Sequence, residues 1–287
     1  MFTVDQILDE HYPTLRKKKF LFSIIHPFLK KILHEQTFID YAEKYPYHQG
    51  IEFVESILEF FDFSYFVDDR ERENIPSSGR VVIIANHPIG SLDGLALLQL
   101  IHGIRADVKI VVNDMLMALP PLRPMVLPVN NMGGSNRKKE LERIYNYLEN
   151  GHAVIFFPAG EVSRFNSKGI VDGKWHTGFL KIATKTKSPI LPIHVTGRNS
   201  TLFYLTSLIA KPLSTALLIE EMFKQRSKQI NFTIGSLISF DTIHTLNLPR
   251  NEKSKLLKKH LYRIGKNRKG LLKTETAIAR PERKADL

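Results

Sequence analysis

The sequence predicts an α/β fold whose central, mostly parallel sheet is flanked by helices and preceded by an N-terminal helical segment. The first observation is that short apolar runs typical of buried strands alternate with stretches of helical length and pattern. The second is size, since the chain has 287 residues, of which 43% are hydrophobic, enough to bury a substantial core. Alternating strands and helices favour parallel pairing, because each helix returns the chain to the edge of the sheet where the strand began.

The apolar runs define the predicted strands, and helical patterns lie between them. The predicted strands are residues 80–85, 108–112, 125–129, 153–157, 190–195 and 230–234. The predicted helices are residues 94–102, 137–150, 176–187 and 251–264.

A charged, turn-rich segment at residues 68–79 divides the chain. Residues 1–78 are predicted to form an N-terminal amphipathic helical segment, residues 79–265 the main α/β domain, and residues 266–287 a basic flexible tail. In the first region, residues 16–33 mix lysines with large apolar side chains. Such a stretch either lies in a bilayer interface or packs on the main domain with its lysines in solvent, and the sequence leaves both interpretations open.

The composition excludes several kinds of chemistry. The chain has no cysteine, which removes disulfides, zinc–thiolate sites and thiol nucleophiles. Its 41 Lys and Arg outnumber its 29 Asp and Glu, and a formal charge of +12 attracts polyanions such as nucleic acid or an anionic bilayer. Composition alone does not choose between these polyanions, although the basic residues are scattered and form no RNA-binding or helix-turn-helix pattern, which argues against nucleic acid.

The hydropathy pattern predicts a peripheral protein. No run reaches the roughly 18 apolar residues that a spanning helix needs, and the start of the chain lacks the basic and apolar regions of a secretory signal. The nearest candidate, residues 202–223, is interrupted by Lys211 and Pro212 and carries Glu220 and Glu221. That segment predicts a pair of interfacial or buried helices.

The most informative segment is 81–94, where an apolar strand ends at His87 and a helix begins near Asp93. Pro88 disfavours helical backbone at His87, and Gly90 permits backbone angles that other residues avoid, so a tight loop is expected. On such a loop, Asp93 can turn back to His87, fix its tautomer and leave the other ring nitrogen to accept a proton. In isolation, the pattern is more simply explained by a strand-end histidine and an aspartate that caps the helix.

Blocks of the sequence, taken together, resemble the glycerolipid (lysophospholipid) acyltransferases. The first block is Asn86 and His87 followed by Asp93, similar to the His and Asp of that family. The second, residues 156–164, is similar to the family's Phe-Pro-Glu-Gly-Thr-Arg-Ser block, and the third, residues 178–193, to the helix and strand that close the family's core. Each block is weak alone, but their shared order makes chance agreement a poor explanation.

The sequence departs from the family pattern in two places. Five residues, instead of four, separate His87 from Asp93, and Ala159 stands where the family has glutamate, with Glu161 two positions later. Both departures resemble a divergent, hemolysin-like bacterial branch related to acyltransferases of amino-acid lipids such as ornithine lipids. They bear on the identity of the acceptor more than on the chemistry.

The resemblance implies an O-acyltransferase in which His87 and Asp93 are the catalytic dyad. In that family the histidine acts as general base on the acceptor hydroxyl, which attacks the thioester of acyl-CoA or acyl-carrier protein. No metal and no cofactor are implied beyond this donor substrate. Backbone N–H groups near Gly90 or Gly160 are the expected donors to the oxyanion.

The implied partners are an acyl donor, an anionic membrane surface on the cytoplasmic side, and a lyso-lipid acceptor, either lysophosphatidic acid or a lyso-amino-acid lipid. Arg137 opens a helix after a loop suited to anion binding. Arg164 suits a phosphate or carboxylate, and Glu161 orients either the acceptor or that arginine, with a plain salt bridge as the alternative. The predicted substrate-binding residues are Asn86, Gly90, Arg137, Gly160, Glu161, Ser163 and Arg164.

Two rival classes remain open from the sequence. Ala159, in place of the family's glutamate, is compatible with a catalytically inactive lipid-binding relative. The net charge is compatible with a basic nucleic-acid-binding protein.

Overall fold

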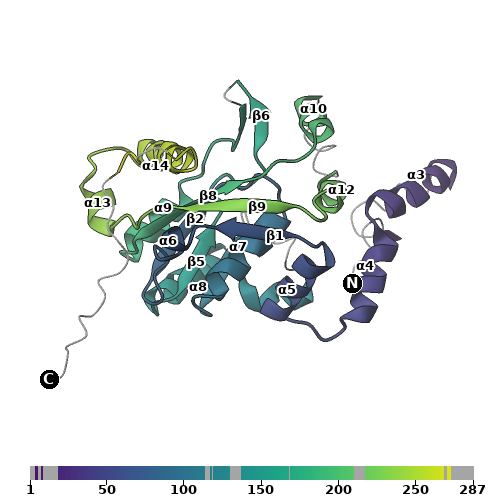
Figure 1. The fold of residues 1–287 in the computed structure, drawn as a ribbon, viewed down its shortest axis with the longest axis horizontal. Helices are drawn as coiled ribbons and strands as arrows, with labels where there is room; N and C mark the ends of the chain where they lie inside the picture. Colours follow the sequence, from purple (N-terminus) through teal and green to yellow (C-terminus); the bar gives the residue numbers. More distant parts are fainter. Residues whose placement is uncertain are drawn as a thin grey trace.

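A computed structural model describes residues 4–5, 8, 19–113, 117, 119–129, 137–167, 169–209, 217–267 and 270–272 of the chain. It shows one large sheet with helices packed on both faces, and the N-terminal helices α3 and α4 lie to one side of this body (Figure 1). The predicted α/β class is confirmed.

The central sheet has seven strands in the order β1-β9-β8-β2-β5-β3-β4. Neighbouring strands are parallel except β8 and β9, which run antiparallel. Every predicted strand is present, with bounds that agree within about one residue. The strands are β1 Ser64–Val67, β2 Val81–Ala85, β3 Val108–Val112, β4 Val126–Pro128, β5 Ala153–Phe156, β8 Ile190–Thr196 and β9 Gln229–Ile234.

The predicted helices are also present, and several shorter ones join them. The predicted helices correspond to α7 Leu92–His102, α8 Arg137–Glu149, α9 Gly178–Lys185 and α14 Arg250–Ile264. The others are α3 Lys19–Ile32, α4 Glu35–Lys44, α5 Ile51–Phe60, α6 Asp69–Arg72, the 3₁₀ helix η2 Pro120–Met125, α10 Thr201–Ile209, α12 Leu218–Phe223 and α13 Phe240–Thr245. Within residues 202–223, the described part of the chain contains α10 and α12, whereas residues 210–216 lie outside the described residues.

Strand β2 lies between β5 and β8 and is buried on both faces, as its unbroken apolar sequence predicts. Successive side chains of a strand point to opposite faces. Ile83 packs into the core that includes α5 and α7, while Val82 and Ile84 pack into the core that includes α8, α9 and α14. The carboxyl end of β2 is therefore held between neighbours, where α/β proteins place ligand sites.

Two strand pairs were not predicted. The first is formed by β1 at the edge of the sheet, which pairs in parallel with β9. The second is a separate hairpin, β6 Arg164–Asn166 and β7 Gly169–Val171. The division of the chain at residue 78 stays a prediction, and the structure adds that β1, before that boundary, belongs to the central sheet.

Helix α4 packs against the main body along its length. At its start, the ring of His34 stacks on Phe223 with 3.6 Å between centroids, and its Nε2 lies 2.7 Å from the carboxylate of Glu220. Further along, the buried Tyr41 joins the core that includes α5 and α7. Helix α3, in the segment for which two interpretations were left open, presents Phe28 with 60% of its surface exposed. The choice between bilayer contact and packing for residues 16–33 stays a prediction.

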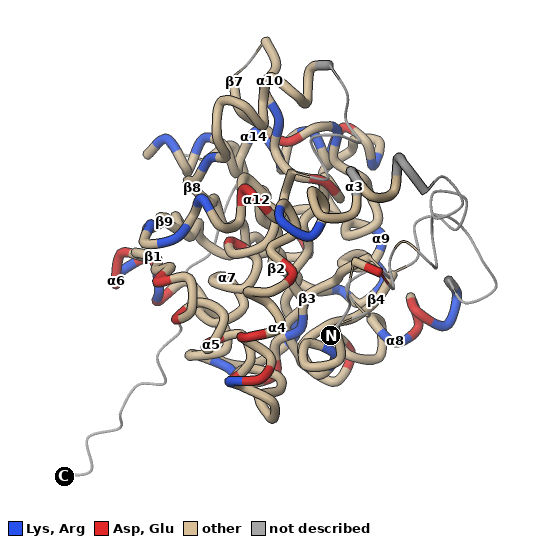
Figure 2. Tube along the Cα trace, turned by 90° about the vertical axis from the view of Figure 1, so that its right-hand side faces the viewer, with Lys and Arg blue, Asp and Glu red and all other residues tan. Residues whose placement is uncertain are grey.

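Lys and Arg are spread over many elements of the described chain, with Asp and Glu interspersed (Figure 2). Among the described residues, no helix combines the length and the apolar character needed to cross a membrane.

Candidate active site

The loop after β2 begins with Asn86, which is buried against the neighbouring strand β8. Its side-chain amide donates to the carbonyl oxygen of Val195 at 2.8 Å and accepts from the N–H of the same residue at 2.7 Å. This reciprocal pair fixes the start of the loop. The amide of Asn86 is thus engaged with backbone, although the sequence analysis placed this residue among those that bind substrate.

His87 and Asp93 meet across the loop, as predicted. Nδ1 of His87 lies 3.2 Å from Oδ2 of Asp93, and the carboxylate is fully buried while 17% of the His87 side chain is exposed. The imidazole stacks on the ring of Phe157, with 4.0 Å between centroids and 20° between planes. The backbone of Gly90 also hydrogen-bonds to the imidazole, and the exposed fraction of the side chain leaves the ring accessible to a ligand.

Asp93 also fixes the shape of the loop. Its carboxylate accepts hydrogen bonds from the backbone N–H groups of Ile89 at 2.9 Å, Gly90 at 3.1 Å and Gly94 at 3.0 Å. The N–H groups at the start of α7 and in the preceding loop favour its charged form. The N-cap-like role and the contact with His87 are therefore combined in one carboxylate, and the two interpretations of Asp93 do not exclude each other.

The pKa values of the pair follow from burial and mutual charge. Burial lowers the pKa of His87, but the charge and hydrogen bonding of Asp93, with the charge of Asp172, raise it above its usual 6.5 overall. Burial raises the pKa of Asp93, but His87 and the backbone N–H donors lower it below its usual 3.8 overall. At neutral pH Asp93 is an anion, and the raised pKa makes the imidazole of His87 a stronger base.

The two glycines proposed near the oxyanion are turn residues with their N–H groups in use. Gly90 has a φ of 107°, and a Cβ there would lie 3.1 Å from the side chain of Val162. Its N–H is bound to Asp93, and the N–H of Gly160 donates to the carbonyl oxygen of Phe157 at 3.0 Å. Neither of these two N–H groups is free to bind an oxyanion, and the role of other N–H groups near them stays a prediction.

Asp172 is a site residue that the sequence analysis missed. Its buried Oδ1 accepts from the backbone N–H of His87 at 3.3 Å and from the Ser163 hydroxyl at 2.5 Å, and its Oδ2 accepts from the indole N–H of Trp175 at 2.8 Å. The N–H of Ser163 donates to the carbonyl oxygen of His87 at 2.7 Å. Asp172 and Ser163 together join the loop after β2 to the loop after β5.

Helix α14 holds Asp172 from the far side. The hydroxyl of Tyr262 accepts from the N–H of Asp172 at 2.8 Å, and Nζ of Lys258 donates to the carbonyl oxygens of Asp172 and Gly173 at 2.6 and 2.7 Å. In the sequence, Asp172 stands alone among turn residues, some 90 positions before its partners on α14. No local spacing signals this contact.

Glu161 and Arg164 form the ion pair that the sequence analysis considered. Nε of Arg164 lies 3.4 Å from Oε2 of Glu161, and the arginine side chain is 14% exposed. The guanidinium also lies 5.5 Å from the ring centre of Phe203 on α10. Both residues follow β5, and Ser163 between them reaches His87, so this loop is brought to the same edge of the sheet.

One predicted site element lies outside the described residues. Residues 130–136, which precede α8, are not described, and neither is the side chain of Arg137. The contribution of Arg137 to the site stays a prediction.

The fold and this loop geometry define an α/β protein with a buried His–Asp pair at the carboxyl edge of its sheet. Comparison with protein families shows that residues 6–268 match the family described as Acyltransferase. The chain belongs to this acyltransferase family.

Curated relatives agree with this assignment. The chain is 31% identical over 258 residues to a lyso-glycine lipid O-acyltransferase of Bacteroides thetaiotaomicron, a match that covers 87% of this chain and 92% of the relative. It is likewise 31% identical over 241 residues to the protein of the same name in Phocaeicola vulgatus, with 82% and 85% covered. Among solved structures, the 1-acyl-sn-glycerophosphate acyltransferase of Thermotoga maritima aligns with a TM-score of 0.47 and 16% identity, covering 85% of this chain and 97% of that one.

Proposed function

We propose that this acyltransferase moves a fatty acyl group from a thioester, acyl-CoA or acyl-carrier protein, onto the hydroxyl of a lyso-amino-acid lipid, with His87 as the general base. The observation that carries the proposal is the orientation of the imidazole. Nδ1 faces the buried Asp93 carboxylate at 3.2 Å, while 17% of the His87 side chain is exposed and open to a substrate. This is the arrangement that fixes a tautomer and presents one basic nitrogen to a substrate.

The proposed reaction needs only proton transfer and attack on a carbonyl. Nε2 of His87 takes the proton of the acceptor hydroxyl as its oxygen attacks the thioester carbonyl carbon. The tetrahedral intermediate then collapses, the carbon–sulfur bond breaks, and the imidazolium returns the proton to the leaving thiolate. The negative Asp93 stabilises the imidazolium between these two transfers, and the stacked Phe157 limits the rotation of the ring.

The acceptor assignment is supported by two separate features. Ala159 is buried where the resembled family has glutamate, and Glu161 is paired with Arg164 at the site. The two curated relatives act, by their names, on lyso-glycine lipid. A lyso-amino-acid lipid, lyso-glycine lipid first among them, is the proposed acceptor, and the reaction takes place at the cytoplasmic face of a membrane, where lipid acceptors are found.

A thiol-release assay tests the chemistry. Purified protein is mixed with acyl-CoA or acyl-carrier protein and with either lyso-glycine lipid or lysophosphatidic acid, and both free thiol and acylated lipid are measured. We expect His87→Ala to lower turnover by roughly 10²-fold or more with an unchanged Tm, because the ring fills no core position. Turnover by His87→Ala at the parent rate would rule out the assigned base.

The comparison of acceptors tests the substrate. We expect lyso-glycine lipid to be at least as good an acceptor as lysophosphatidic acid. A strong preference for lysophosphatidic acid would reject the amino-acid lipid assignment and leave the acyl transfer itself intact.

A further inference from the structure

Helix α10 is apolar around most of its circumference, yet it lies at the surface. Its nine residues include no charged side chain. Leu202, Leu205 and Leu208 recur at every third position and are 55%, 55% and 61% exposed. Phe203 on the opposite side is fully buried, and Phe165 of the neighbouring hairpin is 51% exposed. We call the three leucines and Phe165 the leucine face, and such a surface is typical of a binding interface.

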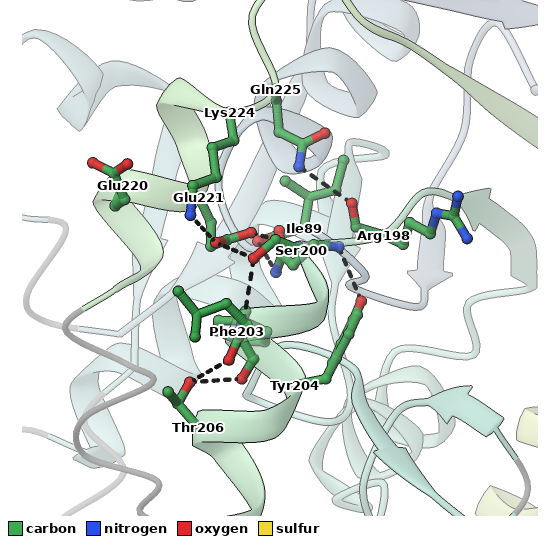
Figure 3. A network of polar contacts seen from close by, with 12 residues as sticks. Ile89, Arg198, Ser200, Phe203, Tyr204, Thr206, Glu220, Glu221, Lys224 and Gln225 are labelled. Carbon is green, nitrogen blue, oxygen red and sulfur yellow. Dashed lines mark hydrogen bonds and ion pairs between the residues drawn. The ribbon is translucent and has the colours of Figure 1, made fainter.

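The leucine face is held in place by a buried carboxylate. Figure 3 shows Glu221 of α12 directed at the start of α10, where it accepts from the N–H and the hydroxyl of Ser200 at 2.6 and 2.7 Å. Lys224 donates to the same carboxylate at 2.9 Å, and the Ser200 hydroxyl accepts from the N–H of Phe203 at 3.2 Å. Ser200 is therefore a bonded N-cap. The leucines are exposed on an anchored helix and not on a frayed end.

The leucine face lies next to the candidate active site for a topological reason. Strands β5, β2 and β8 are parallel neighbours, so their carboxyl ends share one edge. The β6–β7 hairpin follows β5 and α10 follows β8, on either side of the loop that follows β2. Asn199, just before α10, donates to the carbonyl oxygen of Ile89 in that loop at 3.1 Å. Arg164 of the hairpin stacks on Phe203 of α10, which joins the two flanking elements.

Cations lie beside the leucines. A cavity of about 750 Å³ opens between α10, the hairpin and the end of α12. Leu205 and Leu208 line it together with Arg198, Lys224 and Lys228. Apolar side chains next to Arg and Lys match the layered chemistry of a bilayer surface, in which acyl chains lie beneath anionic head groups.

We propose that the leucine face docks on an anionic bilayer and holds the carboxyl edge of the sheet against the lipid surface. This inference rests on the proposed function in one respect: the proposed acceptor, a lyso-lipid, resides in such a surface. It places membrane contact on α10 and the hairpin, whereas the sequence pointed to residues 16–33. A bilayer is favoured over a second copy of the chain because two copies, each with a charge of +12, repel each other.

Vesicle co-sedimentation of the full chain, without donor or acceptor, tests the proposal. The vesicles contain equimolar phosphatidylglycerol and phosphatidylcholine. We expect Leu205→Asp, and separately Leu208→Asp, to weaken binding by roughly tenfold or more, because each removes a leucine from the lipid contact. Arg198→Gln should weaken binding to these vesicles and leave binding to pure phosphatidylcholine unchanged.

The matched control is Leu248→Asp. Leu248 is 43% exposed in the segment between α13 and α14, so this variant adds the same negative charge away from the leucine face. We expect it to bind as the parent does. An unchanged Tm for every variant shows that a loss of binding does not come from unfolding.

Two results of the vesicle assay overturn the proposal. One is parental binding by both Leu205→Asp and Leu208→Asp. The other is loss of binding in Phe28→Asp alone, which would assign membrane contact to α3. The result is separable from the proposed chemistry, because His87→Ala should bind vesicles like the parent even if it transfers no acyl group. A concentration-dependent dimer that dissociates in Leu205→Asp, without any vesicle binding, would identify a second copy as the occupant.

Discussion

At the scale of single residues, His87 is held by groups on three sides. Asp93 faces its Nδ1, Phe157 stacks on the ring, and Asp172 accepts from its backbone N–H. The carboxylates raise the pKa of the imidazole more than burial lowers it. The ring is thereby positioned and made more basic by the same contacts.

The raised pKa of His87 predicts a specific pH dependence. A general base must be neutral, so kcat/KM should rise with pH through a midpoint above 6.5, the usual pKa of histidine. Asp93→Asn removes the main group that raises this pKa, so the midpoint should move toward acid while kcat/KM falls by roughly 10²- to 10⁴-fold. A pH–rate profile of parent and variant, at subsaturating acceptor, makes the comparison. An identical midpoint in both proteins would show that a group other than His87 causes the rise of kcat/KM with pH.

The catalytic candidates were predictable from sequence only in part. His87 and Asp93 are six positions apart on one loop, so local backbone rules sufficed to bring them together. Asp172, Tyr262 and Lys258 come from segments that meet only when the sheet and α14 assemble. Their polar contacts are long-range and leave no periodic or spacing signal in the chain.

At the scale of elements, α10 and α12 form a unit around a buried charge. The Glu221 side chain is 1% exposed and accepts from both Ser200 and Lys224. Burial raises the pKa of Glu221, but the Ser200 and Lys224 donors lower it below its usual 4.5 overall. A carboxylate with a lowered pKa stabilises the fold above its usual pKa, and that contribution is lost as the pH falls through the lowered value.

Glu221→Gln should therefore destabilise the protein in a pH-dependent way. We expect a loss of roughly 1–3 kcal/mol in unfolding free energy at pH 7, because one acceptor of a buried, charge-assisted network is replaced by a neutral amide. The difference between parent and variant should shrink as the pH drops below about 4.5. Denaturant unfolding at several pH values measures this difference, and the control is Glu252→Gln, because the Glu252 side chain is 49% exposed. A constant difference at all pH values would contradict the assignment of a charged Glu221.

The elements themselves were predicted where burial imposes a strong pattern. The interior strands β2, β3, β5 and β8 are apolar runs, and the long helices show clear periodicity. By contrast, β1 reads Ser-Tyr-Phe-Val with Phe66 57% exposed, and β6 and β7 are three-residue strands that pair only with each other. Short strands with exposed or half-buried side chains carry little of the burial pattern on which such predictions depend, whereas the equally short edge strand β4 is buried and was predicted.

At the scale of the whole molecule, helix α4 is attached to the main body at two places. Near its middle, the buried ring of Tyr41 belongs to the main core, and its hydroxyl lies 2.5 Å from that of Ser56 on α5. At its start, His34 contacts Phe223 and Glu220 of α12 through a stacked pair and one partly exposed ion pair. The start of α4 is the weaker of the two attachments and can open without unfolding of the sheet.

His34→Ala should loosen this region selectively. We expect amide hydrogen exchange in α4 to accelerate by roughly tenfold, the effect of losing about 1–1.5 kcal/mol of contact, with no change for β2 or β5. Exchange measured by mass spectrometry on parent and variant resolves the two regions. Equal acceleration throughout the sheet would mean that α4 and the sheet unfold as one unit, and that the predicted boundary at residue 78 has no energetic counterpart.

The pairing of β1 with β9 has a consequence for how the protein is made. Ser64 and Gln229 are partners 165 positions apart, and His34 and Glu220 are 186 apart. Because the ribosome releases the chain from its N-terminus onward, β1 and α4 emerge long before the segments that complete them. Strand β1 thus waits without its partner strand, and Val67, buried in the folded protein, is uncovered, a state in which strands associate with other chains. Newly made chains should need their greatest protection from aggregation in this interval, until β9 has been synthesised and pairs with β1.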